Sequence, residues 1–447
     1  MKKRSILKKV GLTLVGLGAV MSGSAIAKMQ VESHGGLTVF DPADNSYWFK
    51  IGGLLQVDEV VFSGNTREKR SDFPNGINIR RSWIDFRGGV GDCWSYRIML
   101  DFRGDPVVIR DAYINFAGIE NTNLAIGQFF IPFGLENFGN KKDLLFLEQS
   151  LMGTAFLAPE FGLGVYADTN FADMFTFAGA VYQPRQVART FGISDFIQSG
   201  AYTARDDRIG EAGRITISPL HCEDMVVHFG GSLKNQVLIS NDGTGQAVFT
   251  NIFQTVPEAQ ARITALLVNA GPIQSKGYTV GGLEAAGLWG PAMLQAEYNQ
   301  AWVRRVNGAS NLSFHGWHVQ GSWVLTGESH LYHFPSGTFG TVIPDSNCGA
   351  WEVAARFSRV NLNDKNVYGG KENNFTLGLN WYFNENVKMM LNYIYADIYA
   401  TNTNITQDFV TFNQPNFSGT LGAAGTVPAD AAKRHLDTFG ARLQVSF

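Results

Sequence analysis

The chain has 447 residues with 36 basic and 39 acidic side chains, which gives a formal net charge of −3. Proteins that bind nucleic acids usually carry a basic surface, so this acidic balance argues against such a partner. Aromatic residues make up 13% of the chain, and glycine contributes 50 residues. Both exceed what a helical globular protein usually needs, and both are typical of an all-β chain.

The first 27 residues have the three parts of a secretory signal. "MKKRSILKK" is basic, "VGLTLVGLGAV" is apolar, and small residues surround the expected cleavage point after Ala27. The alternative is a membrane anchor, but the apolar stretch is short, contains several glycines and is not followed by a stop-transfer pattern. Cleavage would remove five of the 36 basic residues. Residues 28–447 would then carry 31 basic and 39 acidic side chains, a net charge of −8 that fits an exported protein.

Apolar and polar residues alternate in segments throughout the chain. No other stretch of 18 or more apolar residues is present, so no transmembrane helix is expected. Segments such as "CWSYRIMLDFRGD", "AWEVAARF" and "FTLGLNWYF" have an aromatic-rich apolar face and a face that carries polar or charged residues. A soluble β-sandwich also alternates, but this combination favours a transmembrane antiparallel β-barrel with a watery lumen. A chain embedded in lipid without helices must close, because only closure satisfies every backbone group.

The pattern predicts about 16 strands in one domain, the barrel, which spans residues 28–447. Even strand counts are the rule for such barrels. The predicted strands are 47–62, 77–90, 94–104, 107–118, 122–130, 161–169, 174–184, 206–218, 224–238, 276–289, 292–306, 314–326, 350–361, 373–384, 387–400 and 436–447.

The last segment, "TFGARLQVSF", is expected to pair with the first strand and close the barrel. One set of its side chains should face lipid or a neighbouring subunit, and the other set should face the lumen. The outward set is Phe439, Leu443, Val445 and Phe447, and the inward set is Arg442 and Gln444.

Short and long connections alternate along the chain, as periplasmic turns and outer loops do in these barrels. The long connections are 131–160, 185–205, 239–275 and 401–435. Segment 327–349 is also long, although it should be a periplasmic turn by its place in the order. Either this segment is a genuine periplasmic excursion, or the strand count is wrong there.

The long connection after the fifth predicted strand, "IPFGLENFGNKKDLLFLEQSLMGTAFLAPE", is the third outer loop and is partly apolar. Long loops without regular structure tend to be functional in compact proteins, so we expect it to fold into the pore. It would then bury residues 144–147 against the inner wall and present Lys141 and Lys142 to the channel. The alternative is a solvent-exposed cap.

Arginines recur on the polar faces of the second and third strands. Guanidinium groups that line a narrow pore would attract anions, and their forked donors suit phosphate. Asp85 and Asp101 between them would neutralise part of that field, so a salt-bridge network that stiffens the wall is the alternative reading. The candidate pore-lining residues are Arg81, Arg87, Arg97 and Arg103, with Arg214 and Arg356 as weaker candidates.

The sequence predicts neither a metal site nor an enzyme. His315 and His318 are three residues apart, as are His330 and His333. On a strand this spacing puts the two rings on opposite faces, which disfavours a shared metal. No nucleophile elbow, phosphate-binding glycine loop or zinc signature is present, so neither catalysis nor a cofactor is expected.

Cys93, Cys222 and Cys348 each fall in a predicted periplasmic connection. The first two are separated by six strands, which is too far for a direct disulfide. Cys348 could pair with one of them, one cysteine could link to a neighbouring protein, or all three could be free thiols.

Five blocks of sequence together resemble one family, the phosphate-selective porins O and P of Gram-negative outer membranes. The blocks are "DAYINF", "IGQFFIPFGLENF", "FHGWHVQGSWVLTGE", "GAWEVAARFSRVNLND" and "NNFTLGLNWYFNENVKMMLNY". The resemblance implies a 16-stranded barrel in the outer membrane lipid bilayer, usually a homotrimer, with an inward-folded third outer loop. It also implies that lysines and arginines guide small anions to a constriction, and the loop position carries this role to Lys141 and Lys142.

The expected function is therefore passive diffusion of small hydrophilic solutes through an outer-membrane porin, with a preference for anions such as phosphate or pyrophosphate. The acidic balance of the chain keeps a general or cation-tolerant porin open as an alternative. A barrel for adhesion or surface structure, with loops 239–255 and 401–427 as its working parts, is another. An outer-membrane hydrolase is a further one.

Overall fold

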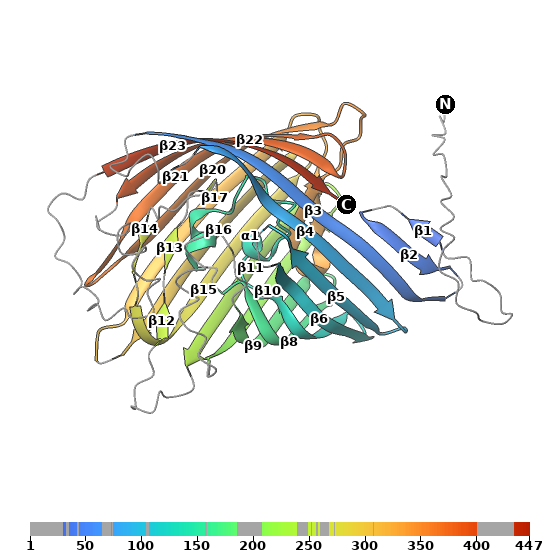
Figure 1. Cartoon of the computed structure of the whole chain (residues 1–447), viewed down its shortest axis with the longest axis horizontal. Helices are drawn as coiled ribbons and strands as arrows, with labels where there is room; N and C mark the ends of the chain where they lie inside the picture. Colours follow the sequence, from blue (N-terminus) through green and yellow to red (C-terminus); the bar gives the residue numbers. More distant parts are fainter. Residues whose placement is uncertain are drawn as a thin grey trace.

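The strands close on themselves into a tilted barrel (Figure 1). This is a computed structural model. Residues 1–29, the predicted signal peptide included, lie outside the described residues, and signal cleavage stays a prediction. The residues that the structure describes are 30–32, 35–42, 44–64, 73, 75–103, 107–156, 159–185, 208–238, 249–251, 253–255, 258–259, 268–271, 273–306, 308–399 and 433–447.

Sixteen antiparallel strands form the barrel, and each corresponds to one predicted from the sequence. Their ends differ from the predicted ones by a few residues. The strands are β3 (Asp44–Ser63), β4 (Gly76–Val90), β5 (Trp94–Asp101), β6 (Val108–Ile119), β7 (Thr122–Phe130), β8 (Phe161–Phe171), β9 (Phe175–Arg185), β10 (Arg208–Cys222), β11 (Met225–Leu238), β15 (Ile273–Trp289), β16 (Ala292–Arg305), β17 (Leu312–Val324), β20 (Ala350–Asp364), β21 (Val367–Tyr382), β22 (Val387–Tyr399) and β23 (Lys433–Ser446).

The last strand closes the barrel against the first. β23 pairs with β3 from Asp437 to Ser446, and the backbone pairing continues to the final residue. The Phe447 N–H donates to the Gly53 carbonyl at 3.1 Å, and the Gly53 N–H donates to the Phe447 carbonyl at 2.8 Å. A Cβ at Gly53 would lie 2.5 Å from the Phe447 ring, so glycine makes room for this closing aromatic residue.

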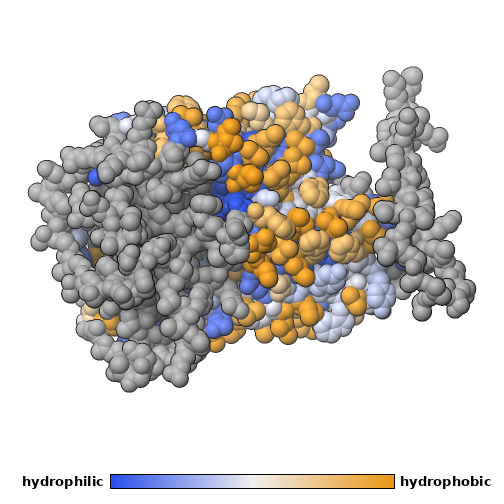
Figure 2. Space-filling view, in the orientation of Figure 1, coloured by the Kyte–Doolittle hydropathy of each residue, from blue (hydrophilic) through white to orange (hydrophobic). Residues whose placement is uncertain are grey.

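Side chains alternate around the closed sheet as the sequence predicts. On β23, Phe439 and Leu443 are about half exposed, whereas Arg442 and Gln444 are buried. The same alternation leaves a belt of apolar side chains on the outer surface, visible as orange patches in Figure 2. An apolar surface of this extent is typical of contact with lipid. Arg442 and Gln444 face inward as expected but do not stand in open water, because segment 131–160 covers them.

Short strands and helices accompany the sixteen barrel strands. The main sheet has 19 strands, since β1 (Gln30–Glu32), β2 (Leu37–Asp41) and β12 (Phe249–Asn251) add to the barrel strands. A separate pair is formed by β13 (Gln254–Thr255) and β14 (Val268–Asn269), and segment 131–160 contains the short helices α1 (Leu135–Phe138) and α2 (Leu151–Phe156). No helix in the described part of the chain has the length and apolar character needed to cross a membrane.

Segment 327–349 is a genuine excursion, and the strand count was correct. It contains β18 (His330–His333), the 3₁₀ helix η2 (Phe334–Ser336) and β19 (Thr338–Val342), and β18 pairs with β19. The tip contacts the barrel wall, since the Arg214 guanidinium donates to the carbonyls of Ser336 and Gly337 at 2.7 and 2.8 Å. Gly337 has φ +57°, and a Cβ there would lie 2.8 Å from Thr216 Oγ1, so the close approach needs glycine.

His330 anchors the base of this hairpin to the wall. Its Nε2 is 2.6 Å from Glu352 Oε1 and its Nδ1 is 2.9 Å from the Gly340 carbonyl, so both ring nitrogens face acceptors. Burial lowers the pKa of His330, but the Glu352 carboxylate and the carbonyl outweigh burial and raise it above its ordinary value. The raised pKa means that this anchor stabilises the hairpin fully below the ordinary histidine pKa and is lost as the pH rises through the raised one.

We predict that the hairpin loosens as the pH rises past the raised His330 pKa. The measurement is hydrogen exchange of residues 330–342 across that range, corrected for the intrinsic exchange rate. His330→Gln should abolish the pH dependence, whereas His333→Gln, which replaces an exposed ring in the same hairpin, should keep it. An unchanged pH profile in His330→Gln would contradict the role of this anchor.

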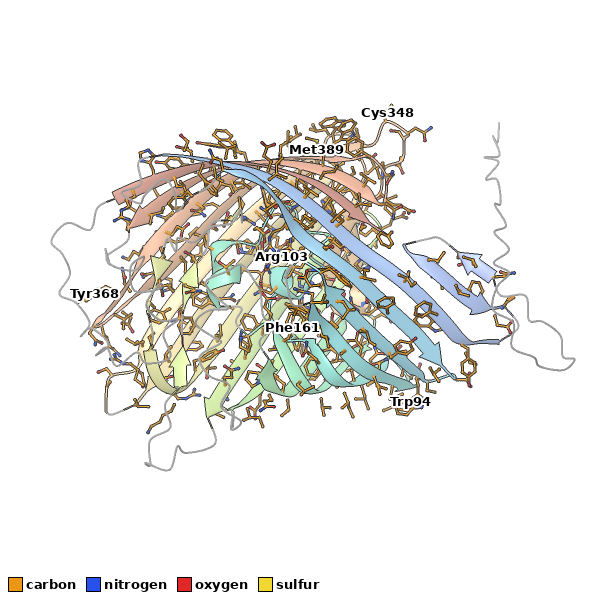
Figure 3. All side chains as sticks on the ribbon, in the orientation of Figure 1. Trp94, Arg103, Phe161, Cys348, Tyr368 and Met389 are labelled. Carbon is orange, nitrogen blue, oxygen red and sulfur yellow. The ribbon has the colours of Figure 1, made fainter. Side chains whose placement is uncertain are left out.

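The predicted disulfide alternative for Cys348 is wrong within the chain. All three cysteines are free, with Cys222 and Cys348 exposed. They lie at the ends of different strands, and neighbouring strands are about 4.8 Å apart, so the rim separates them beyond the short span of a disulfide. Figure 3 shows Cys348 and Trp94, the neighbour of Cys93, well apart at the end of the barrel that also holds the C-terminus.

Candidate functional site

A row of basic side chains crosses the inner face of β3, β4 and β5. Lys50 lies directly opposite Arg87, and Arg87 lies directly opposite Arg97. Like charges in such cross-strand pairs are destabilising. One carboxylate, Asp85, is shared by the two arginines at 2.6 and 2.9 Å, and Asp111 lies 3.5 Å from Arg97. The row therefore brings three basic side chains together beside two carboxylates.

The basic members of this row are also the more accessible ones. The Arg87 side chain is 45% exposed and that of Arg97 is 21% exposed, whereas Asp85 and Asp111 are 12% and 8% exposed. Solvent and solutes in the lumen therefore meet guanidinium groups before they meet carboxylates.

Two β-bulges add arginines that strict alternation does not predict. On β4, Gln56 pairs with Arg81 but the next residue pairs with Ile79, so Arg80 is an extra residue. Arg80 and Arg81 consequently both reach inward, which is what a bulge allows. A second bulge, on β6, turns Arg110 inward beside Asp111 in the same way. The sequence predicted Arg81 but not Arg80 or Arg110, because no local sequence pattern marks a β-bulge.

Glu148 of segment 131–160 is the centre of a buried cluster of guanidinium groups. Arg80 donates to it at 2.9 Å, Arg81 at 3.2 Å and Arg442 at 3.1 Å, and Arg442 also pairs with Asp58 at 2.6 Å. Burial raises the pKa of Glu148, but the three arginines outweigh burial and hold it well below its ordinary value. The carboxylate is therefore charged and fixes this segment to β4 and β23.

Arg103 and Arg110 extend the basic region toward segment 131–160. The Arg110 guanidinium lies 4.2 Å from the centre of the Trp83 ring and within 3.9 Å of both Asp101 and Glu160. Arg103 donates to the Arg80 carbonyl at 3.3 Å, and Figure 3 shows it near the middle of the barrel's length. All four arginines predicted as pore-lining are thus gathered in one region of the inner wall.

The ion pairs of this region balance in charge. They join six arginines to six carboxylates: Arg80, Arg81, Arg87, Arg97, Arg110 and Arg442 to Asp58, Asp85, Asp101, Asp111, Glu148 and Glu160. Lys50 and Lys142, both partly exposed, lie beside this network.

The two lysines predicted at the loop have different surroundings. Lys141 is buried, and its Nζ donates to the Asn137 carbonyl at 2.8 Å and lies 5.1 Å from the centre of the Phe130 ring. Lys142 is only partly buried and is close enough to Lys50 for their charges to interact. Lys142 is therefore the better candidate for contact with a solute, while Lys141 stabilises the loop itself.

The opposite part of the lumen holds buried carboxylates together with buried basic side chains such as Arg214, Lys234 and Lys388. Segment 131–160 packs on this part, since Arg356 donates to the Glu148 carbonyl at 3.0 Å and Asn380 donates to the Leu145 carbonyl at 3.0 Å. Arg356 also pairs with two of the carboxylates at 2.7 and 3.3 Å. The carboxylates, each at most 9% exposed, are Glu136, Glu258, Glu284, Glu297, Glu352 and Glu372.

A model of the family "Phosphate-selective porin O and P" matches residues 49–416. The chain belongs to this family. It is 26% identical to Porin O of Pseudomonas aeruginosa over an alignment of 402 residues. The alignment covers 83% of this chain and 87% of that protein. Membership identifies the barrel as an outer-membrane channel of a Gram-negative bacterium.

Solved structures agree with the fold. The chain is similar to OmpT, an outer membrane protein of Vibrio cholerae, with 12% identity and a TM-score of 0.51, over 90% of this chain and 98% of that one. The trimer form of OmpT gives 11% identity and a TM-score of 0.50, over 90% of this chain and 100% of that one. At this identity the likeness shows the barrel architecture alone.

We predict that Glu148→Gln destabilises the protein by about 3–5 kcal/mol, because it leaves three buried guanidinium groups without their shared carboxylate. Denaturant unfolding in detergent measures the loss. Glu120→Gln, at the exposed turn between β6 and β7, is the matched control and should change stability by less than about 0.5 kcal/mol. Equal stability of the two variants would show that Glu148 does not hold the cluster together.

Proposed function

We propose that the chain is a porin for small hydrophilic anions, such as phosphate or pyrophosphate, which cross by passive diffusion. One observation carries the proposal: in the row on β4 to β6 the side chains of Arg87 and Arg97 are 45% and 21% exposed, whereas Asp85 and Asp111, which pair with them, are 12% and 8% exposed. A solute responds to the charges it can approach, because buried ion pairs cancel one another over short distances. Membership of the family and the similarity to Porin O support the same reading.

The geometry suggests how an anion would move along this wall. Arg87 and Arg97 offer donors in adjacent positions, and Lys142 lies near Lys50 at one end of this row. Guanidinium forks match the oxygens of a phosphate. Asp85 and Asp111 hold the arginines in place and compete with the anion for their donors. Conduction needs binding that is favourable enough for the anion to enter and weak enough for it to leave. Competition from the two aspartates weakens binding and so favours release.

We further propose that segment 131–160 narrows the channel. Its residues 144–147 are buried against inward side chains of β3, β20 and β22. Arg87 and Arg97 stay partly exposed on the part of the wall that the segment leaves accessible. Its Glu148 and Lys142 both belong to the basic region, so the segment would form one side of the passage.

The net charge of the chain favours the second candidate, a general or cation-tolerant porin. Planar-bilayer recordings in a salt gradient separate the two, because the sign of the reversal potential gives the preferred ion. A cation-selective potential would overturn the anion proposal. The absence of any channel would favour an adhesion barrel or an enzyme. Of the two loops predicted as the working parts of an adhesion barrel, 401–427 lies outside the described residues, and 239–255 is described only at 249–251 and 253–255.

We predict that Arg87→Ala combined with Lys142→Ala lowers the anion-to-cation permeability ratio on the order of tenfold, the lower end of electrostatic focusing in charged clefts. Lys142→Ala alone should also weaken block of the current by phosphate more than Lys141→Ala does, because Lys141 is buried. Lys276→Ala removes one charge at an exposed lysine at the outer end of β15 and is the matched control for the single variant Lys142→Ala. An unaltered ratio in the double variant would place the selective site elsewhere.

We also propose that the protein assembles as a homotrimer. Its support is the exposed apolar belt and the fold shared with a protein described in a trimer form. Mass measurement of the detergent-solubilised complex tests it, and a mass of one chain would contradict it.

A further inference from the structure

Three potential metal ligands meet where α1 lies against the barrel wall. Glu136 comes from α1, Glu297 from β16 and His318 from β17, and all three are buried. One ligand atom from each lies within 4.8 Å of the others. The three side chains come from separate elements, so the fold alone brings them together.

Glu297 accepts three hydrogen bonds. Its oxygens accept the N–H groups of Leu135 and Glu136 at 2.9 and 2.7 Å, and the amide of Gln295 at 3.0 Å. Glu297 therefore caps the first N–H groups of α1.

Glu136 is an acceptor in the same way. It receives the Ser150 N–H at 3.0 Å and an Arg356 N–H at 3.3 Å. A third carboxylate, Glu284, lies directly opposite Glu297 on β15. Three acidic groups thus adjoin in a buried region, where uncompensated charge is costly.

Positive charge is distributed unevenly among these carboxylates. Glu284 pairs with Arg214 at 2.6 Å, and Glu136 pairs with Arg356. Among the ion pairs of the described residues, Glu297 has only one, with His318 at 3.9 Å. That distance is too long for a hydrogen bond.

His318 is the second, independent sign of a missing ligand. Its side chain is 0% exposed, and neither ring nitrogen has a hydrogen-bond partner among the described residues. Burying a polar group without a partner is unfavourable. An imidazole with unused nitrogens beside an undercompensated carboxylate is the donor set that a cation would complete.

We propose that Glu136, Glu297 and His318 bind a divalent transition-metal cation. One imidazole nitrogen and two carboxylate oxygens suit zinc and its neighbours better than magnesium or calcium, which prefer oxygen ligands alone. The cation would balance the charge of Glu297, occupy a ring nitrogen of His318 and connect segment 131–160 to β16 and β17. This site is separate from the basic region and does not depend on the anion proposal.

The test uses the full chain in detergent, stripped of metal with a chelator and titrated with Zn²⁺ by calorimetry. We expect one Zn²⁺ per chain and a higher melting temperature with Zn²⁺ than without it. His318→Ala should weaken Zn²⁺ binding by more than about 100-fold, because mutating even a hydrogen-bond partner of a metal ligand typically lowers metal affinity about 10–100-fold. His315→Ala, on the opposite face of the same strand, is the matched control and should bind Zn²⁺ as the unmodified chain does.

Two results would overturn the proposal: no Zn²⁺ binding by the unmodified chain, or equal binding by His318→Ala. If His318→Ala does not fold, a Co²⁺ titration of the unmodified chain replaces it. Intense absorption bands of a low-coordinate Co²⁺ site support the proposal, and the weak spectrum of the hydrated ion contradicts it. A chain that binds Zn²⁺ but conducts cations would refute only the anion channel.

Discussion

Closure of the sheet is the constraint on which the rest of the structure depends. Lipid offers no partner to an unpaired backbone N–H or C=O, and each such group costs several kcal/mol. β23 removes the free edge by pairing with β3, and the pairing extends to Phe447 itself. Once the sheet is closed, every strand has one face toward lipid and one toward the lumen. The properties of the channel then follow from how the lumen face is filled.

Two segments of the chain contact this face. Segment 131–160 and the hairpin within 327–349 both contact inward side chains, and buried charged groups hold both in place. Glu148 receives arginines from β4 and β23, and Glu297 receives the first N–H groups of α1. These contacts bury carboxylates of the lumen face, whereas Arg87 and Arg97 on β4 and β5 stay partly exposed.

Much of the fold could be predicted from the sequence because a lipid-facing strand must alternate with a period of two. All sixteen barrel strands and the roles of the side chains on β23 were identified in this way. The structure gathers Arg81, Arg87, Arg97 and Arg103 in one region of the wall, and their role in the pore stays a prediction. Arg80 and Arg110 were missed, because a bulge depends on the register between two strands and leaves no local mark.

The sequence by itself determined the barrel, its strand count, the direction of each side chain in regular strands and the family. The alternation of apolar and polar residues and the five family-like blocks can be recognised within short stretches of sequence. Only the tertiary structure decided which charges are exposed, that Lys141 is buried while Lys142 is not, and that His318 lies beside Glu136 and Glu297. The physical reason is that pairing and burial join residues far apart in the chain. Whether a charge meets water or a partner depends on those long-range contacts.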